Sequence, residues 1–253
     1  GPDSAYSGRG SGGGSINLSS KTPKLVDFTN LSLGGGTDSY WRGTIDQNWR
    51  ISDNAAFRIN VLSASGDVAR RNAVDYDKLG VAASFGVGID TDNTAILSFN
   101  YLDSDQMPDY GIPLYTKRGG ATAPRENAEG ILNVPYDTFY GLTSRDYLNN
   151  TVKSATLRLE HRFSPNLTIR NVTRYAETLN DYVVTNPGDG GNAVLVDGAW
   201  WMKRGLKSRW NPVDTTANVT ELFGTFNTGG IKHSFDLGAE FTHEINRNAL
   251  HTT

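Results

Sequence analysis

The sequence has no cysteine, no long apolar run and no marked excess of charge of either sign. Without cysteine, the chain forms no disulfide, no thiolate metal site and no cysteine nucleophile. No run approaches the ~18 apolar residues of a membrane-spanning helix, although a membrane β-barrel stays possible because its strands alternate apolar and polar residues. The net charge is −3, from 24 Lys and Arg against 27 Asp and Glu. No global field therefore attracts nucleic acid, and any electrostatic selectivity must be local.

Apolar and polar residues alternate along most of the chain, the period that is typical of a β-strand with two different faces. Residues 41–51, for example, place tryptophan and isoleucine on one face and arginine, aspartate and asparagine on the other. Most of these segments run for about 10 to 12 residues, enough to cross a bilayer at a tilt. About nine such strands are predicted, near residues 25–33, 39–51, 54–65, 78–89, 93–103, 151–163, 166–178, 217–228 and 231–245.

From the second predicted strand onward, short and long connections alternate. The short ones, at 52–54, 90–93, 164–166 and 228–230, are rich in Ser, Asp, Asn, Pro and Gly, the residues that accept tight turns. The long ones lie near 66–77, 104–150 and 179–216. Structureless loops of such length are unusual in a compact soluble domain. An outer-membrane barrel has short periplasmic turns and long external loops, so the pattern favours a barrel.

The sequence SGRGSGGGS at residues 7–15 matches the G-x-G-x-x-G spacing of a dinucleotide-binding loop through Gly8, Gly10 and Gly13. That function requires a strand before the glycines and a helix after them, because the helix N-terminus holds the phosphate. Only seven residues precede Gly8, and residues 15–23 alternate like a strand and end at a proline. No Gly-Lys-Ser/Thr closes the run either. The glycines therefore predict a turn that leads into a strand.

Together with its neighbours, this stretch resembles the end of the plug domain of TonB-dependent outer-membrane receptors, where a glycine-rich sequence leads into the first barrel strand. One departure is Tyr6-Ser7-Gly8, where the family more often has Leu-Tyr-Gly. A second segment, MPDYGIP at 107–113, resembles part of the third external loop of siderophore receptors, especially those for catecholate ligands. The positions that match the plug end are Gly1, Pro2, Ser4, Gly8, Arg9, Gly10, Ser11, Gly13, Gly14, Ile16, Asn17, Leu18, Lys21 and Pro23.

The resemblance implies an all-β fold, an antiparallel transmembrane β-barrel of the bacterial outer membrane. Family members have about 22 strands around a plug. Residues 1–23 would be the C-terminal end of the plug domain, and residues 24–253 the first nine or so barrel strands. Most of the plug, the energy-coupling box and about thirteen strands would be missing. We therefore expect a fragment that neither closes a barrel nor transports alone, and whose open edges favour aggregation.

The implied function is TonB-dependent uptake of a ferric siderophore, with no resident cofactor. The implied partners are the siderophore, outer-membrane lipid and the TonB complex, which would act through the missing N-terminal part. Iron complexes of catecholates and hydroxamates present planar rings and negative charge, which suit aromatic faces and arginines. Such side chains also pack loops against themselves or lie in solvent. The candidate contacts in the third and fourth external loops are Tyr110, Tyr115, Arg118, Arg125, Tyr136, Trp200, Trp201 and Arg204.

Catalysis and metal binding find little support in the sequence. Of the four histidines, only His233 and His243 share a strand face, and they lie too far apart along it for one ion. Asp103 and Asp105 fit a turn-forming cluster, and no G-x-S-x-G motif occurs. We predict no enzyme and no metal site. The alternatives are a passive porin-like barrel, which would lack the plug, and a secreted structural protein or adhesin, which would not need alternating loop lengths.

Overall fold

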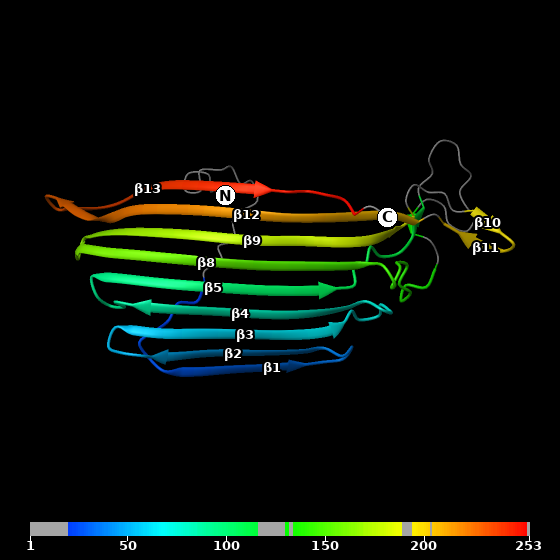
Figure 1. Ribbon diagram of the computed structural model, residues 1–253, viewed down its shortest axis with the longest axis horizontal. Coiled ribbons are helices and arrows are strands. Elements are labelled where there is room, and N and C mark those ends of the chain that lie inside the picture. Colours follow the sequence, from blue (N-terminus) through cyan, green and yellow to red (C-terminus); the bar gives the residue numbers. More distant parts are fainter. Residues whose placement is uncertain (1–19, 116–129, 132–133, 189–193, 203, 252–253) are drawn as a thin grey trace.

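The computed structural model describes residues 20–115, 130–131, 134–188, 194–202 and 204–251. Its main feature is an antiparallel sheet of nine strands that follow one another in chain order (Figure 1). This confirms the predicted all-β class and the predicted number of strands. The strands are β1 (Phe28–Gly35), β2 (Trp41–Arg50), β3 (Ala55–Asp67), β4 (Asp75–Val87), β5 (Asn93–Gln106), β8 (Tyr147–Ser164), β9 (Leu167–Pro187), β12 (Arg204–Thr228) and β13 (Ile231–Asn246).

The sheet is open, with β1 and β13 at its edges. Two short hairpins lie outside it, formed by β6 (Leu114–Tyr115) with β7 (Gly130–Ile131) and by β10 (Val194–Val196) with β11 (Ala199–Trp201). In the described part of the chain, no helix is both long enough and apolar enough to span a membrane.

The connections alternate between the two ends of the sheet, as the sequence predicts. Four tight turns, β2 to β3, β4 to β5, β8 to β9 and β12 to β13, lie together at one end, and the long connections lie at the other (Figure 1). Glycine is required in the β4 to β5 turn, where Gly88 has φ +65° and a Cβ would lie 1.8 Å from the carbonyl oxygen of Asn93. We refer to the end with the long connections as the external end.

Two strands extend much further than predicted. β9 continues to Pro187 and β12 begins at Arg204, because the two strands stay paired from Gly224 with Leu167 to Arg204 with Pro187. Near the external end, both strands contain polar residues and a proline, which obscure the alternation of apolar and polar residues. Pro212 lies just beyond Val213, the last β12 residue paired with β13, where a missing ladder hydrogen bond is tolerated.

The two faces of the sheet differ in chemistry. One row across β2 to β8 aligns Trp49, Phe57, Phe85, Leu97 and Leu157, and the rings of Trp49 and Phe57 stack at 5.8 Å. Most of these apolar side chains are exposed. A soluble protein would cover such a surface, whereas a membrane strand presents it to lipid. We call this the outer face.

The opposite, inner face is polar, and part of it is buried. A row one residue away from the apolar one aligns Asn48, Arg58, Ser84 and Ser98, all less than 9% exposed. Residues 20–27 lie across this row before the chain turns into β1 (Figure 1). Polar groups are therefore covered on one face, while apolar groups are open on the other.

The outer face carries a polar cluster within its apolar surface, the amide quartet of Asn171 and Thr173 on β9 and Asn218 and Thr220 on β12. Each asparagine amide donates two hydrogen bonds and accepts two within the quartet, at 2.7 to 3.5 Å. Each threonine hydroxyl donates one and accepts one. The quartet therefore satisfies its own donors and acceptors beside apolar side chains of the neighbouring strands, namely Leu157, Leu159 and Phe241.

Candidate functional site

One guanidinium group joins three connections at the external end of the sheet. Arg71, between β3 and β4, donates from Nε and Nη2 to the two carboxylate oxygens of Asp109 at 2.6 and 2.8 Å. Its Nη1 donates to the backbone carbonyl of Tyr136. The Arg71 and Asp109 side chains are only 13% and 18% exposed. A bidentate, largely desolvated pair of this kind fixes geometry as well as contributing energy.

Backbone hydrogen bonds complete this junction. The amide of Gly111 donates to Asp109 Oδ1 at 2.8 Å, and Gly111 itself has φ +81°, a conformation that favours glycine. The amide of Asn72 donates to the carbonyl of Asp137 at 2.7 Å. Asp109 thus closes a tight turn within the Pro-Asp-Tyr-Gly segment and also receives the arginine. The MPDYGIP motif therefore has a structural role in holding the loops together.

A cavity of about 980 Å³ opens beside the junction and includes Arg70, Gly111, Ile112 and Tyr136 in its lining. The Arg71 charge is balanced by Asp109, whereas Arg70 is exposed with φ +61°. Tyr136 is 60% exposed, and Tyr110, next to Gly111, is 54% exposed. The cavity therefore combines a cationic side chain with nearby aromatic rings, which suits a planar, anionic ligand.

A second junction surrounds Asp146, whose side chain is fully buried. Its carboxylate accepts from the amides of Leu142 and Thr185 at 3.1 and 2.8 Å and from Arg145 Nε at 3.0 Å. Burial raises the pKa of this carboxyl, but hydrogen bonds from Thr185, Leu142 and Arg145 outweigh it, so the pKa lies below its ordinary value of 3.8. This junction fixes residues 141–146 against the part of β9 near the external end of the sheet.

The structure places the candidate ligand contacts predicted from the sequence at different positions. Tyr136 lines the cavity, and Tyr110 lies in the turn that the bond from Gly111 to Asp109 closes at the junction. Trp201 is 64% exposed in β11, and Arg204 donates to the carbonyl of Gly141 at 3.1 Å, so it is tied to a loop. Tyr115 lies in β6 and Trp200 lies in β11, each a strand of a short hairpin outside the main sheet. Arg118 and Arg125 lie outside the described residues.

Sequence reasoning missed Arg70, Arg71 and Asp109 as parts of the site. Asp109 lies inside the MPDYGIP motif, and the Arg70-Arg71 pair is a visible cationic signal in the preceding long connection. Arg71 and Asp109 are 38 residues apart, however, and no local pattern pairs them. Among the described residues, no group of three His, Asp or Glu side chains is placed to hold a metal ion.

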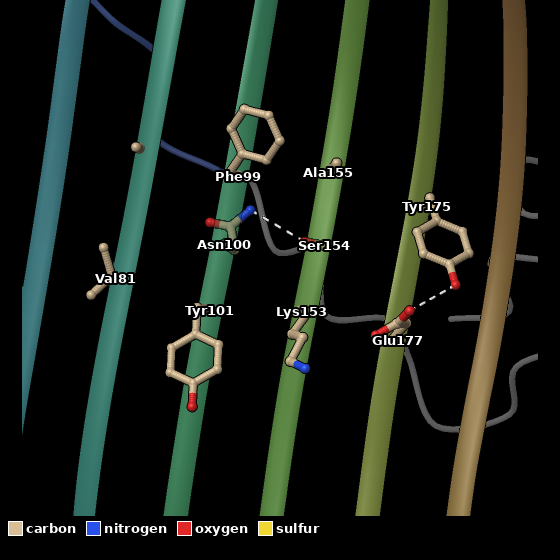
Figure 2. A pocket seen from close by; sticks show the side chains of 10 residues that line it. Val81, Phe99, Asn100, Tyr101, Lys153, Ser154, Ala155, Tyr175 and Glu177 are labelled. Carbon is tan, nitrogen blue, oxygen red and sulfur yellow. Dashed lines mark hydrogen bonds between the residues drawn. The ribbon is translucent and has the colours of Figure 1, made fainter.

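A second cavity, of about 430 Å³, lies on the outer face between β4 and β9 and includes Phe99, Tyr101, Ala155 and Tyr175 in its lining. Figure 2 shows the hydroxyls of Tyr101 and Tyr175 pointing along the strands toward the external end, where Tyr175 donates to Glu177 at 2.9 Å. Rings in lipid with hydroxyls toward the headgroups are typical of the aromatic girdle of a membrane barrel. The position of this cavity thus indicates lipid contact.

Known proteins with similar sequences cover nearly the whole chain. It is 37% identical over 242 residues to the probable TonB-dependent receptor BfrD of Bordetella pertussis, covering 95% of this chain and 31% of BfrD. It is 38% identical over 245 residues to the probable TonB-dependent siderophore receptor PiuA of Acinetobacter baumannii, covering 96% of this chain and 32% of PiuA. The chain thus spans about a third of the length of these relatives. No family model matches it.

The fold is likewise that of a solved receptor. The closed-form crystal structure of the ferric-catecholate import receptor Fiu from Escherichia coli K12 superposes with a TM-score of 0.88 at 32% sequence identity. The match covers 98% of this chain and 36% of the Fiu chain. The nine-stranded open sheet therefore corresponds to part of the Fiu fold.

Proposed function

Because the chain belongs to the family of TonB-dependent siderophore receptors, we propose that the receptor which carries it takes up a ferric siderophore across the bacterial outer membrane. The observation that carries this proposal is the junction at Arg71, beside which Arg70 and Tyr136 line an open cavity. The cavity lies at the external end of the sheet, where a ligand from outside would arrive.

The chemistry of the cavity favours a ferric catecholate. Catecholate rings are planar and their iron complexes are anionic, so tyrosine faces and the Arg70 guanidinium provide complementary surfaces. The name of the similar receptor Fiu is consistent with this class. The other candidates would contribute as the ligand settles between the loops: Tyr115, Arg118, Arg125, Trp200, Trp201 and Arg204.

The receptor would move its ligand without making or breaking a covalent bond in it, so we propose a transporter and no enzyme. Residues 1–23 would form the end of an inner plug domain, and residues 24–253 would form barrel strands and external loops. The TonB complex would supply energy by acting on the plug. A passive porin is a poorer fit, because residues 20–27 lie across the inner face.

Growth of a deletion strain tests the proposal. An iron-starved strain that lacks the receptor should fail to use ferric catecholates, and the wild-type gene should restore growth. Arg70→Ala combined with Tyr136→Ala should weaken binding of the chelate to the purified receptor by about tenfold or more, as for hot-spot side chains. Arg209→Ala, an exposed arginine on β12 outside the cavity lining, is the matched control. Unchanged use of every chelate after deletion, in a strain without a second receptor, would refute the proposal.

A further inference from the structure

The segment before β1 is attached to the inner face of the sheet by its backbone. Asn48 Nδ2 donates to the carbonyls of Lys24 and Val26, each at 2.7 Å, and Asn48 Oδ1 accepts from the amide of Lys24 at 3.0 Å. Arg58 Nη1 donates to the carbonyl of Thr22 at 2.9 Å. Four backbone groups of this extended segment are thus bonded to side chains of β2 and β3.

The side chains that hold this segment are buried and bonded to one another. Arg58 donates to both carboxylate oxygens of Asp46, at 2.8 and 2.7 Å, and both residues are less than 9% exposed. Lys21 Nζ donates to the same carboxylate at 2.8 Å from a more exposed position. Asn48 is completely buried. We call Asp46, Asn48 and Arg58 the clamp.

Lifting the segment would break several of these contacts at once. Asn48 would lose three backbone partners, and Arg58 would lose the Thr22 carbonyl. Polar groups that lose buried partners are costly, and such losses within a network are larger than separate pairs suggest. The clamp therefore resists displacement far more than a flexible linker would.

We propose that Asp46, Asn48 and Arg58 are positioning residues that keep residues 21–26 fixed on the barrel wall while ligand is transported. Any rearrangement of the inner domain then occurs before Lys21, and force on that domain reaches the wall through the clamp. This inference rests on the proposed uptake function, because transport is the process during which the segment is expected to stay in place.

A reversible cross-link tests whether the segment has to move. A Cβ placed on Gly86 lies 3.0 Å from Cγ of Pro23, so Pro23→Cys with Gly86→Cys brings two thiols within disulfide range after a small shift of Ile89. The chain contributes no other cysteine. In the full receptor, uptake of a ferric catecholate should be unchanged between the oxidised and the reduced protein. Loss of uptake on oxidation, with recovery on reduction, would overturn the proposal.

Labelling provides a readout that does not depend on transport. Pro23 is buried, so a cysteine placed there should react slowly with a maleimide in the resting receptor and equally slowly during energised uptake. Asp46→Asn or, as the milder change, Asn48→Ser should increase the labelling rate, whereas Lys21→Met, at the exposed edge, should change it little. If Asp46→Asn and Asn48→Ser are labelled no faster than Lys21→Met, the proposed clamp is refuted. If the receptor takes up no chelate at all, the proposed function fails, but the labelling rates still test the clamp.

Discussion

Replacing one asparagine of the amide quartet should destabilise the receptor more than replacing both. Asn218→Leu removes the two hydrogen bonds that Asn218 donates to Asn171 and Thr173 and the two that it accepts. It also leaves an Asn171 amide hydrogen without a partner on a face that contacts lipid. At about 0.6 kcal/mol for each hydrogen bond within a membrane protein, the loss is about 2 kcal/mol.

The double variant Asn171→Leu with Asn218→Leu removes both amides and leaves an apolar surface that suits lipid. Its stability should lie within about 1 kcal/mol of the wild type, because removing both partners of a buried polar pair is often nearly neutral. Two single losses of about 2 kcal/mol would add to about 4, so the coupling energy should be about 3 kcal/mol, at the upper end for contacting residues.

The measurement is the free energy of unfolding of the full receptor in lipid vesicles, followed by tryptophan fluorescence in increasing urea. Asn100→Leu is the matched control, since Asn100 lies on the inner face and its side chain bonds, among the described residues, only to Ser154 at 3.4 Å. It should change stability by about 0.5 kcal/mol or less. Additive losses in the double variant, or single losses no larger than that of the control, would show that the quartet is not shielded from water by lipid.

Three further outcomes follow from the junctions and the clamp. Arg71→Ala leaves Asp109 largely buried without its cation, so the affinity for a ferric catecholate should fall about tenfold. An unchanged affinity in a titration of the receptor with the chelate, followed by fluorescence quenching, would contradict this. Asp46→Ala should reduce the unfolding free energy by about 3 to 5 kcal/mol, because it leaves a buried arginine unpaired, and a thermal melt measures the loss. Because the pKa of Asp146 is lowered in the folded protein, its ionised carboxylate stabilises the fold at pH values above 3.8. The difference in melting temperature between wild type and Asp146→Asn should therefore shrink as the pH falls below 3.8. A difference that grows would contradict this.

The sequence by itself determined the strands, their two faces and the alternation of turn lengths. A residue's side in a strand depends only on whether its position is odd or even, so Trp49 and Asn48 fall on opposite faces whatever their partners are. Tight turns are equally local, because they need particular residues at particular backbone angles, as at Gly88. The resemblance of residues 107–113 to a loop motif also located Tyr110, which is next to Gly111 in the cavity lining.

Tertiary structure decided which of these residues meet. Arg71 reaches Asp109 across 38 residues, and Asn171 reaches Asn218 across 47, through the register of paired strands and the path of the connections. The added length of β9 and β12 arises in the same way, since each strand is extended by pairing with the other. A local pattern records how a residue lies in its own strand, but a partner far along the chain is selected only when the whole sheet forms.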